Sequence, residues 1–127
     1  MATIKSYTDL EQSKKLAKIL PHESADMYYY TVNGDLYKTP NVIESEDDLY
    51  VDENSVPCWS FAALLNIIPK HIKNYNVLRI DISDNDFAIW YDEIGYGVNN
   101  DLPNIAMESA VDACCELIIK LKERNLL

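Results

Sequence analysis

Two side chains near the middle of the chain are of the types that could do nucleophilic chemistry together. Cys58 and His71 flank one apolar segment, VPCWSFAALLNIIPKHIK, residues 56–73. A thiol attacks as its thiolate, and an imidazole within about 3 Å of it can take the proton. The residues between the two predict a helix roughly 15 Å long. We therefore expect Cys58 and His71 at opposite ends of that helix, not in a dyad.

The helix is predicted from apolar residues that recur at the spacing of one helical face: Phe61, Leu64, Leu65 and Ile68. Ser60 stands where its hydroxyl can cap the first turn, and Pro69 ends the run. Cys58 is then a structural thiol at the entrance of a core helix. The alternative is a reactive thiol whose pKa the helix dipole lowers, with His22 as the free candidate for its base.

Other arrangements that carry chemistry are missing from the sequence. There is no Cys-x-x-Cys, the histidines are far apart, and the side chains of the adjacent Cys114 and Cys115 diverge on a helix, so no metal site is expected. Gly95 and Gly97 lack the third glycine and lysine of a phosphate-binding loop. The sequence indicates no catalytic residue and no cofactor.

The net charge of −10 limits the partners. A surface this acidic repels phosphate backbones and anionic membranes, so we expect neither direct nucleic-acid binding nor membrane binding. A basic protein suits it better. Three cysteines without framework spacing, no signal peptide at the start and no apolar run of about 20 residues together predict a cytoplasmic protein.

Tyrosines and carboxylates supply the candidate interaction residues. Nine tyrosines occur in the chain, and tyrosine contributes area and a hydroxyl to interfaces at low entropic cost. Alternation along a strand places Tyr28 and Tyr30 on one face and Tyr29 on the other. The residues that we single out for protein interaction, which includes self-association, are Tyr28, Tyr30, Tyr37, Glu46, Asp47 and Asp48.

The remaining pattern predicts one α+β domain spanning residues 1–127, in the order α-β-β-α-β-β-α, with a largely antiparallel sheet packed against helices. A first helix covers residues 9–19, capped by Thr8 with Glu11 reaching back. Residues 27–32 and 35–38 form a hairpin around Asn33-Gly34. Residues 41–55 form an acidic loop.

The second half predicts a hairpin and a last helix. Residues 76–83 alternate as a half-buried strand with Leu78, Ile80 and Ile82 on its apolar face, and residues 87–92 return. Residues 95–103 form a loop. One apolar side of the last helix comprises Met107, Ala110, Val111, Cys114, Leu117, Ile118 and Leu121.

Three segments, EQSKKLAKILPHESADMYY, VPCWSFAALLNIIP and VDACCELIIKLKERNLL, resemble a family of small uncharacterised proteins of gut Bacteroidetes-type bacteria and their phages and mobile elements. The likeness covers nearly the whole chain in the same order. The resemblance implies no activity, cofactor or catalytic residue. It does imply an accessory role, such as modulating a protein of the host or of the element.

These observations favour a non-enzymatic, acidic protein-interaction module, an adaptor or inhibitor of a mobile element. One alternative is an enzyme or small-ligand binder that depends on Cys58, with Trp59 or Trp90 in its pocket. Another is a nucleic-acid mimic whose carboxylates occupy a DNA-binding protein.

Overall fold

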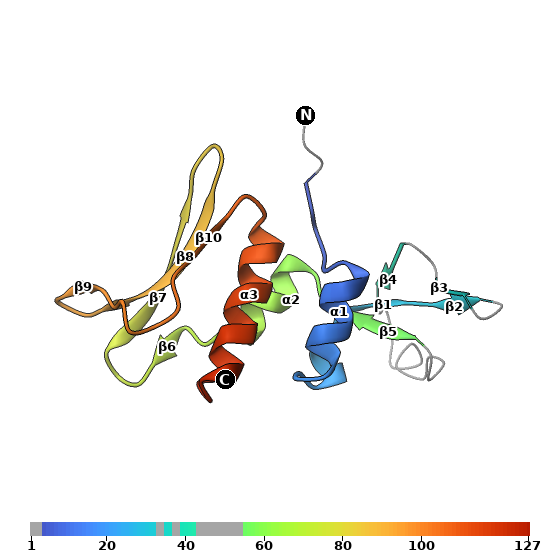
Figure 1. Cartoon of the computed structure of the whole chain (residues 1–127), viewed down its shortest axis with the longest axis horizontal. Coiled ribbons are helices and arrows are strands. Elements are labelled where there is room, and N and C mark those ends of the chain that lie inside the picture. The colour runs from blue at the N-terminus through green and yellow to red at the C-terminus, as the bar shows by residue number, and fades with distance from the viewer. Residues whose placement is uncertain (1–3, 33–34, 37–38, 43–54) are drawn as a thin grey trace.

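The computed structural model describes residues 4–32, 35–36, 39–42 and 55–127. Its helices lie in the middle of the molecule, with strands on both sides of them (Figure 1). The helices are α1 (Leu10–Ala17), α2 (Phe61–Ile67) and α3 (Ala110–Glu123), with a 3-10 turn η1 (His22–Ser24) after α1. The strands are β1 (Met27–Tyr29), β2 (Thr31–Val32), β3 (Asp35–Leu36), β4 (Asn41–Val42), β5 (Val56–Cys58), β6 (His71–Ile72), β7 (Asn76–Ile82), β8 (Phe87–Glu93), β9 (Gly97–Val98) and β10 (Ile105–Met107).

The N-cap of helix α1 is Asp9, one residue later than the predicted cap, Thr8. The Asp9 carboxylate accepts from the Gln12 backbone N–H at 2.8 Å, and the Gln12 side chain accepts from the Asp9 N–H at 3.1 Å. The predicted capping box of Thr8 and Glu11 is therefore wrong. Thr8 is instead fully buried, and its hydroxyl accepts from the N–H of Trp59 at 3.1 Å.

The strands beyond α1 form a small antiparallel sheet in the order β4-β1-β5, beside the two-stranded pair β2-β3. In that pair Thr31 is opposite Leu36 and Val32 is opposite Asp35, so the predicted hairpin is confirmed for these residues. Met27–Tyr29, predicted as part of the same hairpin, pair with β4 and β5 instead. The turn type predicted for Asn33-Gly34 lies outside the described residues. Strand β5 was not expected, because Pro57 interrupts it and its hydrogen-bonding partner β1 is remote in sequence.

The strands at the other end of the molecule form an antiparallel sheet in the order β10-β8-β7-β6, with β9 pairing with β8. The hairpin of β7 and β8 is confirmed: Leu78 faces Tyr91, Ile80 faces Ile89 and Ile82 faces Phe87. Strand β9 lies within the predicted loop, and β10 includes Met107, which was expected on the last helix.

The core lies between α1, α2, α3 and this sheet. Ser60 caps α2 through a hydrogen bond from the Ala63 N–H, as predicted, and Leu64 and Ile68 are buried. Ser109 caps α3. The buried residues of α3 are Val111, Ala113, Cys114, Cys115, Leu117, Ile118 and Leu121. Each large aliphatic side chain buried there contributes roughly 1.5–3 kcal/mol.

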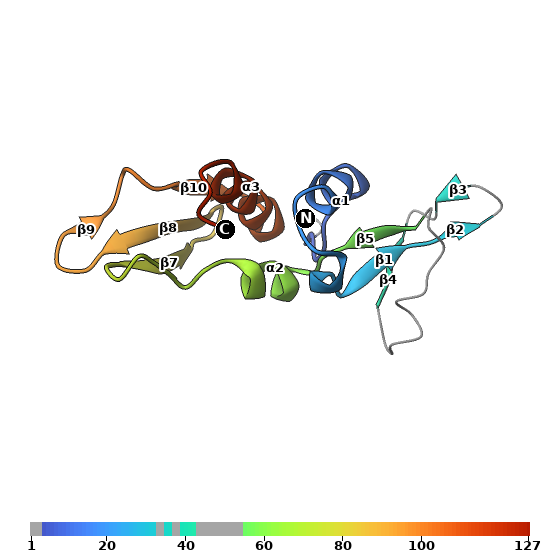
Figure 2. The same ribbon diagram turned by 90° about the horizontal axis from the view of Figure 1, so that it is seen from below.

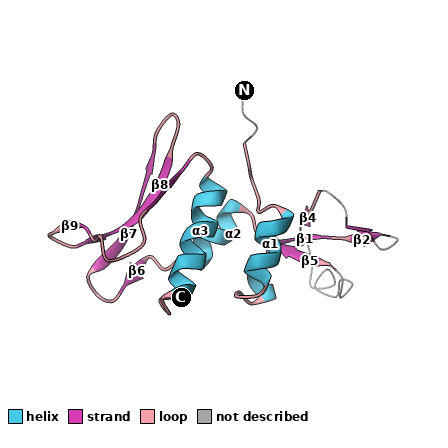
Figure 3. Ribbon diagram, in the orientation of Figure 1, coloured by secondary structure: helices cyan, strands magenta, loops and turns pink. Residues whose placement is uncertain are grey.

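Helices packed on antiparallel sheets make this an α+β fold, as the sequence predicted (Figure 3). Figure 2 shows α1, α2 and α3 between the two groups of strands. Helix α3 packs on α2, β8 and β10. The end of β7 that holds Ile80 and Ile82 extends beyond these contacts and lies at the margin of the core.

Candidate functional site

Cys58 lies on β5, and its position does not favour a nucleophile. Its side chain is 0% exposed. The thiol donates to the carbonyl oxygen of Thr8 at 3.3 Å, and the Thr8 hydroxyl lies 3.5 Å from the sulfur. Burial raises the pKa of the Cys58 thiol, because a thiolate there would lose its water. The arrangement keeps the sulfur protonated and covered.

Neither histidine lies in a position to act as its base. His71 is exposed on β6, in the other sheet, and His22 is exposed in η1. Between Cys58 and either of these described side chains the structure records no hydrogen bond. The expectation that Cys58 and His71 flank the helix is confirmed, since β5 precedes α2 and β6 follows it.

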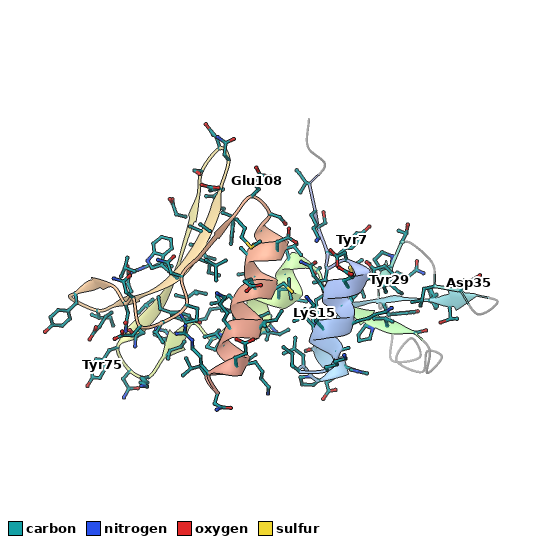
Figure 4. The ribbon with its side chains drawn as sticks, in the orientation of Figure 1. Tyr7, Lys15, Tyr29, Asp35, Tyr75 and Glu108 are labelled. Carbon is teal, nitrogen blue, oxygen red and sulfur yellow. The ribbon has the colours of Figure 1, made fainter. Side chains whose placement is uncertain are left out.

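The predicted tyrosine face is largely turned inward. Tyr28 and Tyr30 share a face, as predicted: their rings meet edge to face with centroids 4.4 Å apart, and their hydroxyls are hydrogen-bonded. Tyr28 is only 3% exposed and Tyr30 is half-buried. The Tyr29 hydroxyl donates to the Thr8 carbonyl oxygen at 2.8 Å, near α1 (Figure 4). Tyr37, Glu46, Asp47 and Asp48 lie outside the described residues.

The two adjacent cysteines of α3, Cys114 and Cys115, are also buried. Burial raises the pKa of Cys114 and of Cys115 to about 12 in each case. Cys114 faces the core as predicted, and Cys115 is buried beside it. Among the described residues, no three or more histidine, cysteine or carboxylate side chains are grouped so that they could hold a metal ion.

Two exposed apolar side chains, Ile80 and Ile82, lie on the same face of β7. Ile80 is 39% exposed and Ile82 is 74% exposed, although both belong to the face whose β8 members, Phe87 and Ile89, are buried. The predicted burial of Ile80 and Ile82 is therefore wrong. Helix α3 covers β8 and β10 and leaves the outer half of β7 open.

Two hollows adjoin this open part of β7. The first, about 440 Å³, is lined by Leu65 of α2 together with Leu78 and Ile80, and also by the basic residues Lys70, His71 and Arg79. The second, about 550 Å³, is lined by Phe61 of α2 and by Ile82. We call the surface formed by Phe61, Leu65, Leu78, Ile80 and Ile82 the β7 groove.

Carboxylates surround one end of the β7 groove. Asp84 and Asp86 in the β7–β8 turn, and Glu108 before α3, line the second hollow and are exposed. Figure 4 shows Glu108 at the start of α3. Within the described part of the chain none of the three is in an ion pair.

The one cation in this hollow is already neutralised among the described side chains. Lys5 contacts Asp9 at 2.9 Å and Asp112 at 2.7 Å. Burial opposes its charge, but these two carboxylates raise the pKa of Lys5. The rim of this second hollow, at the Ile82 end of the groove, is left with a net negative field, which attracts a cationic ligand.

Sequence reasoning found the strand but not its exposure. The alternation of Leu78, Ile80 and Ile82 indicates an apolar face, and it cannot indicate whether a helix covers all of that face. The available signal was the dense acidic turn that follows Ile82, because a carboxylate cluster is costly to bury.

In comparisons with protein-family models, with curated proteins and with solved structures, nothing matched the chain. Within the described residues no helix is both long and apolar enough to cross a membrane.

Proposed function

We propose that the protein is a non-enzymatic, acidic protein-interaction module that binds a basic partner at the β7 groove. The observation that carries the proposal is the exposure of Ile80 and Ile82 beside Asp84, Asp86 and Glu108. Exposed apolar side chains rimmed by charge are typical of interaction surfaces. The net charge of −10 adds long-range attraction for a cationic protein.

The buried thiols support the same proposal. The pKa of Cys58 is raised by burial, whereas a catalytic cysteine requires a thiolate that substrate can reach. The three free, buried cysteines also fit a reducing compartment, so we extend the proposal to a cytoplasmic location. The resemblance of its helical segments to proteins of mobile elements supports an adaptor or inhibitor role.

Selection from a displayed library of random peptides tests this function without a known partner. The immobilised protein at low salt should enrich sequences that combine lysine or arginine with apolar residues. Binding of these sequences should weaken steeply as salt is raised, because the attraction is between charges partly exposed to water. Enrichment of sequences with no basic bias would contradict the proposal.

A charge-reversed protein is the matched control. The triple variant Asp84→Lys, Asp86→Lys and Glu108→Lys changes exposed positions that line the hollow and make no ion pair within the described chain. It should lose the basic selection while its circular dichroism stays that of the parent. Equal enrichment by the parent and the triple variant would place binding elsewhere.

A further inference from the structure

Beyond Leu78, the edge of β7 that faces away from β8 is not paired with any strand of the described residues. The Ser83 N–H donates to the backbone carbonyl oxygen of Asp86 at 2.9 Å. The Leu78 N–H points away from β8 and donates to the backbone carbonyl oxygen of Lys70, also at 2.9 Å. In an antiparallel pair, alternate residues direct their N–H and C=O groups to the same side. The backbone groups of Ile80 and Ile82 therefore point outward, like those of Leu78.

No strand of the described chain uses these groups. Strand β6 pairs with Asn76 and Val77 only, so it ends before Ile80. An open edge with exposed apolar side chains is a template for another strand. Addition of an extended peptide to such an edge is a common mode of recognition, in which backbone hydrogen bonds supply affinity and alternate side chains supply specificity.

Side chains of α2 lie next to this edge and would contact the side chains of an added strand. Phe61 and Leu65 lie one helical turn apart on α2, and each lines one of the two hollows next to β7. A residue opposite Ile80 both exchanges hydrogen bonds with it and points to the same face, toward Leu65. Alternate residues of the added strand would thus be apolar and pack in the β7 groove.

The charges around the edge indicate what the other residues of that strand are. Asp81 is exposed on the opposite face, where it faces Ala88. The acidic turn, with Asp84 and Asp86, lies at the end of the same edge. Arg79 is already paired with Asp92 at 3.2 Å. Lysine or arginine at the alternate positions next to Asp81 and the acidic turn would therefore meet carboxylates.

A second copy of this chain suits the edge less well. Lys70 and β6 occupy the edge beside Leu78, so an antiparallel second copy whose Ile80 and Ile82 pair with Ile82 and Ile80 of the first is centred on Asp81. That register places Asp81 opposite Asp81 of the second copy, and directly opposed like charges destabilise a strand pair. Each copy also carries a net charge of −10.

We infer that the edge of β7 at Ile80 and Ile82 binds an extended segment of a basic protein by strand addition, with apolar residues in the β7 groove alternating with lysine or arginine. The inference rests on the proposed function and specifies its partner segment and binding mode.

Peptides that alternate lysine with valine test the backbone contacts. In the inferred mode the valines face the groove, and their N–H groups bond to Ile80 and Ile82. N-methylation of the valines should raise the dissociation constant at least about tenfold, and N-methylation of the lysines should not. With the unmodified peptide bound, the amides of Ile80 and Ile82 should exchange with solvent at least about tenfold more slowly. Glutamate in place of lysine should abolish binding.

Variants of the protein test the place of binding. Ile80→Lys and Ile82→Lys change exposed side chains, and a lysine on an edge strand opposes pairing. Each variant should raise the dissociation constant of the lysine–valine peptide at least about tenfold. Val98→Lys, at an exposed apolar position of β9, is the matched control and should bind as the parent does.

The outcomes separate this inference from the proposed function. Equal binding of the peptides N-methylated at valine and at lysine overturns strand addition, as does failure of the unmodified peptide to bind. The proposed function would then still be judged by the peptide selection and its charge-reversed control. Slow exchange of the Ile80 and Ile82 amides in a concentrated sample without peptide, together with a dimeric mass, would show a second copy as the occupant and overturn the basic segment.

Discussion

Replacement of Thr8 by valine should destabilise the protein by about 2 kcal/mol. The Thr8 side chain is fully buried, and its oxygen accepts from the Trp59 N–H at 3.1 Å and contacts the Ser13 hydroxyl at 2.8 Å. Valine keeps the shape and removes that oxygen. A buried donor left without a partner costs about 1–3 kcal/mol.

We count only the Trp59 N–H as lost. The Ser13 hydroxyl retains a second acceptor, the Thr8 carbonyl oxygen at 3.5 Å. Urea unfolding of the two proteins measures the effect. With a slope of about 1–3 kcal/mol per molar urea, the midpoint should fall by about 1 M at unchanged slope.

Two further variants make the reasoning refutable. Thr8→Ser keeps the oxygen and loses one methyl group, which costs about 0.8 kcal/mol. Ser13→Ala combined with Thr8→Val should show a coupling of about 0.5–3 kcal/mol, because the two hydroxyls are in contact. A valine variant at least as stable as the serine variant would refute this account of Thr8.

Four other outcomes are expected. A thiol reagent should label no cysteine rapidly in the native protein at neutral pH and all three after unfolding, because Cys58 and both α3 cysteines are buried; rapid labelling of Cys58 would instead support the enzymatic alternative. Leu64→Ala should cost about 2–5 kcal/mol in urea unfolding, since Leu64 is fully buried. Burial opposes the ionised Asp9, but hydrogen bonds from the Gln12 N–H and from Lys5 lower its pKa. The stabilising contribution of Asp9 is therefore present above about pH 4 and is lost as pH falls through the pKa of the folded protein. The Asp9→Asn variant should lose less stability than the parent between neutral and acid pH, and an equal loss in the two proteins would contradict this. Ile82→Lys should change the unfolding free energy by less than about 0.5 kcal/mol, as an exposed position does, and a larger loss would mean that Ile82 is covered.

Elements whose information is local could be predicted from the sequence. The spacing of the apolar residues is enough to predict α2 and the side on which Leu64 and Ile68 are buried, and Pro69 follows its end. The β7–β8 hairpin was found for the same reason, because its two alternating runs are adjacent in the chain.

Elements that depend on contacts with residues remote in the sequence were not predicted. Strand β5 exists because it pairs with β1, and its proline argues locally against a strand. Thr8 and Asp9 are both good cap residues. The choice of Asp9 follows from the burial of Thr8 against Trp59, which is remote in sequence.

The candidate site was missed for a related reason. Leu78, Ile80 and Ile82 were assigned to the core, because alternation indicates that a strand has an apolar face but not whether a helix packs on that face. A structural thiol at position 58 was predicted, but its contacts with Thr8 could be known only from the folded chain.

The place of α3 in the core bears on how the protein is made. Leu117, Ile118 and Leu121 are fully buried at the centre of the molecule, yet α3 is synthesised after every other described element. Until α3 leaves the ribosome, the apolar sides of α2 and β8 on the nascent chain have no cover. Such intermediates aggregate or engage chaperones. A stop codon before Ala110 should therefore give an insoluble product, not a smaller folded one.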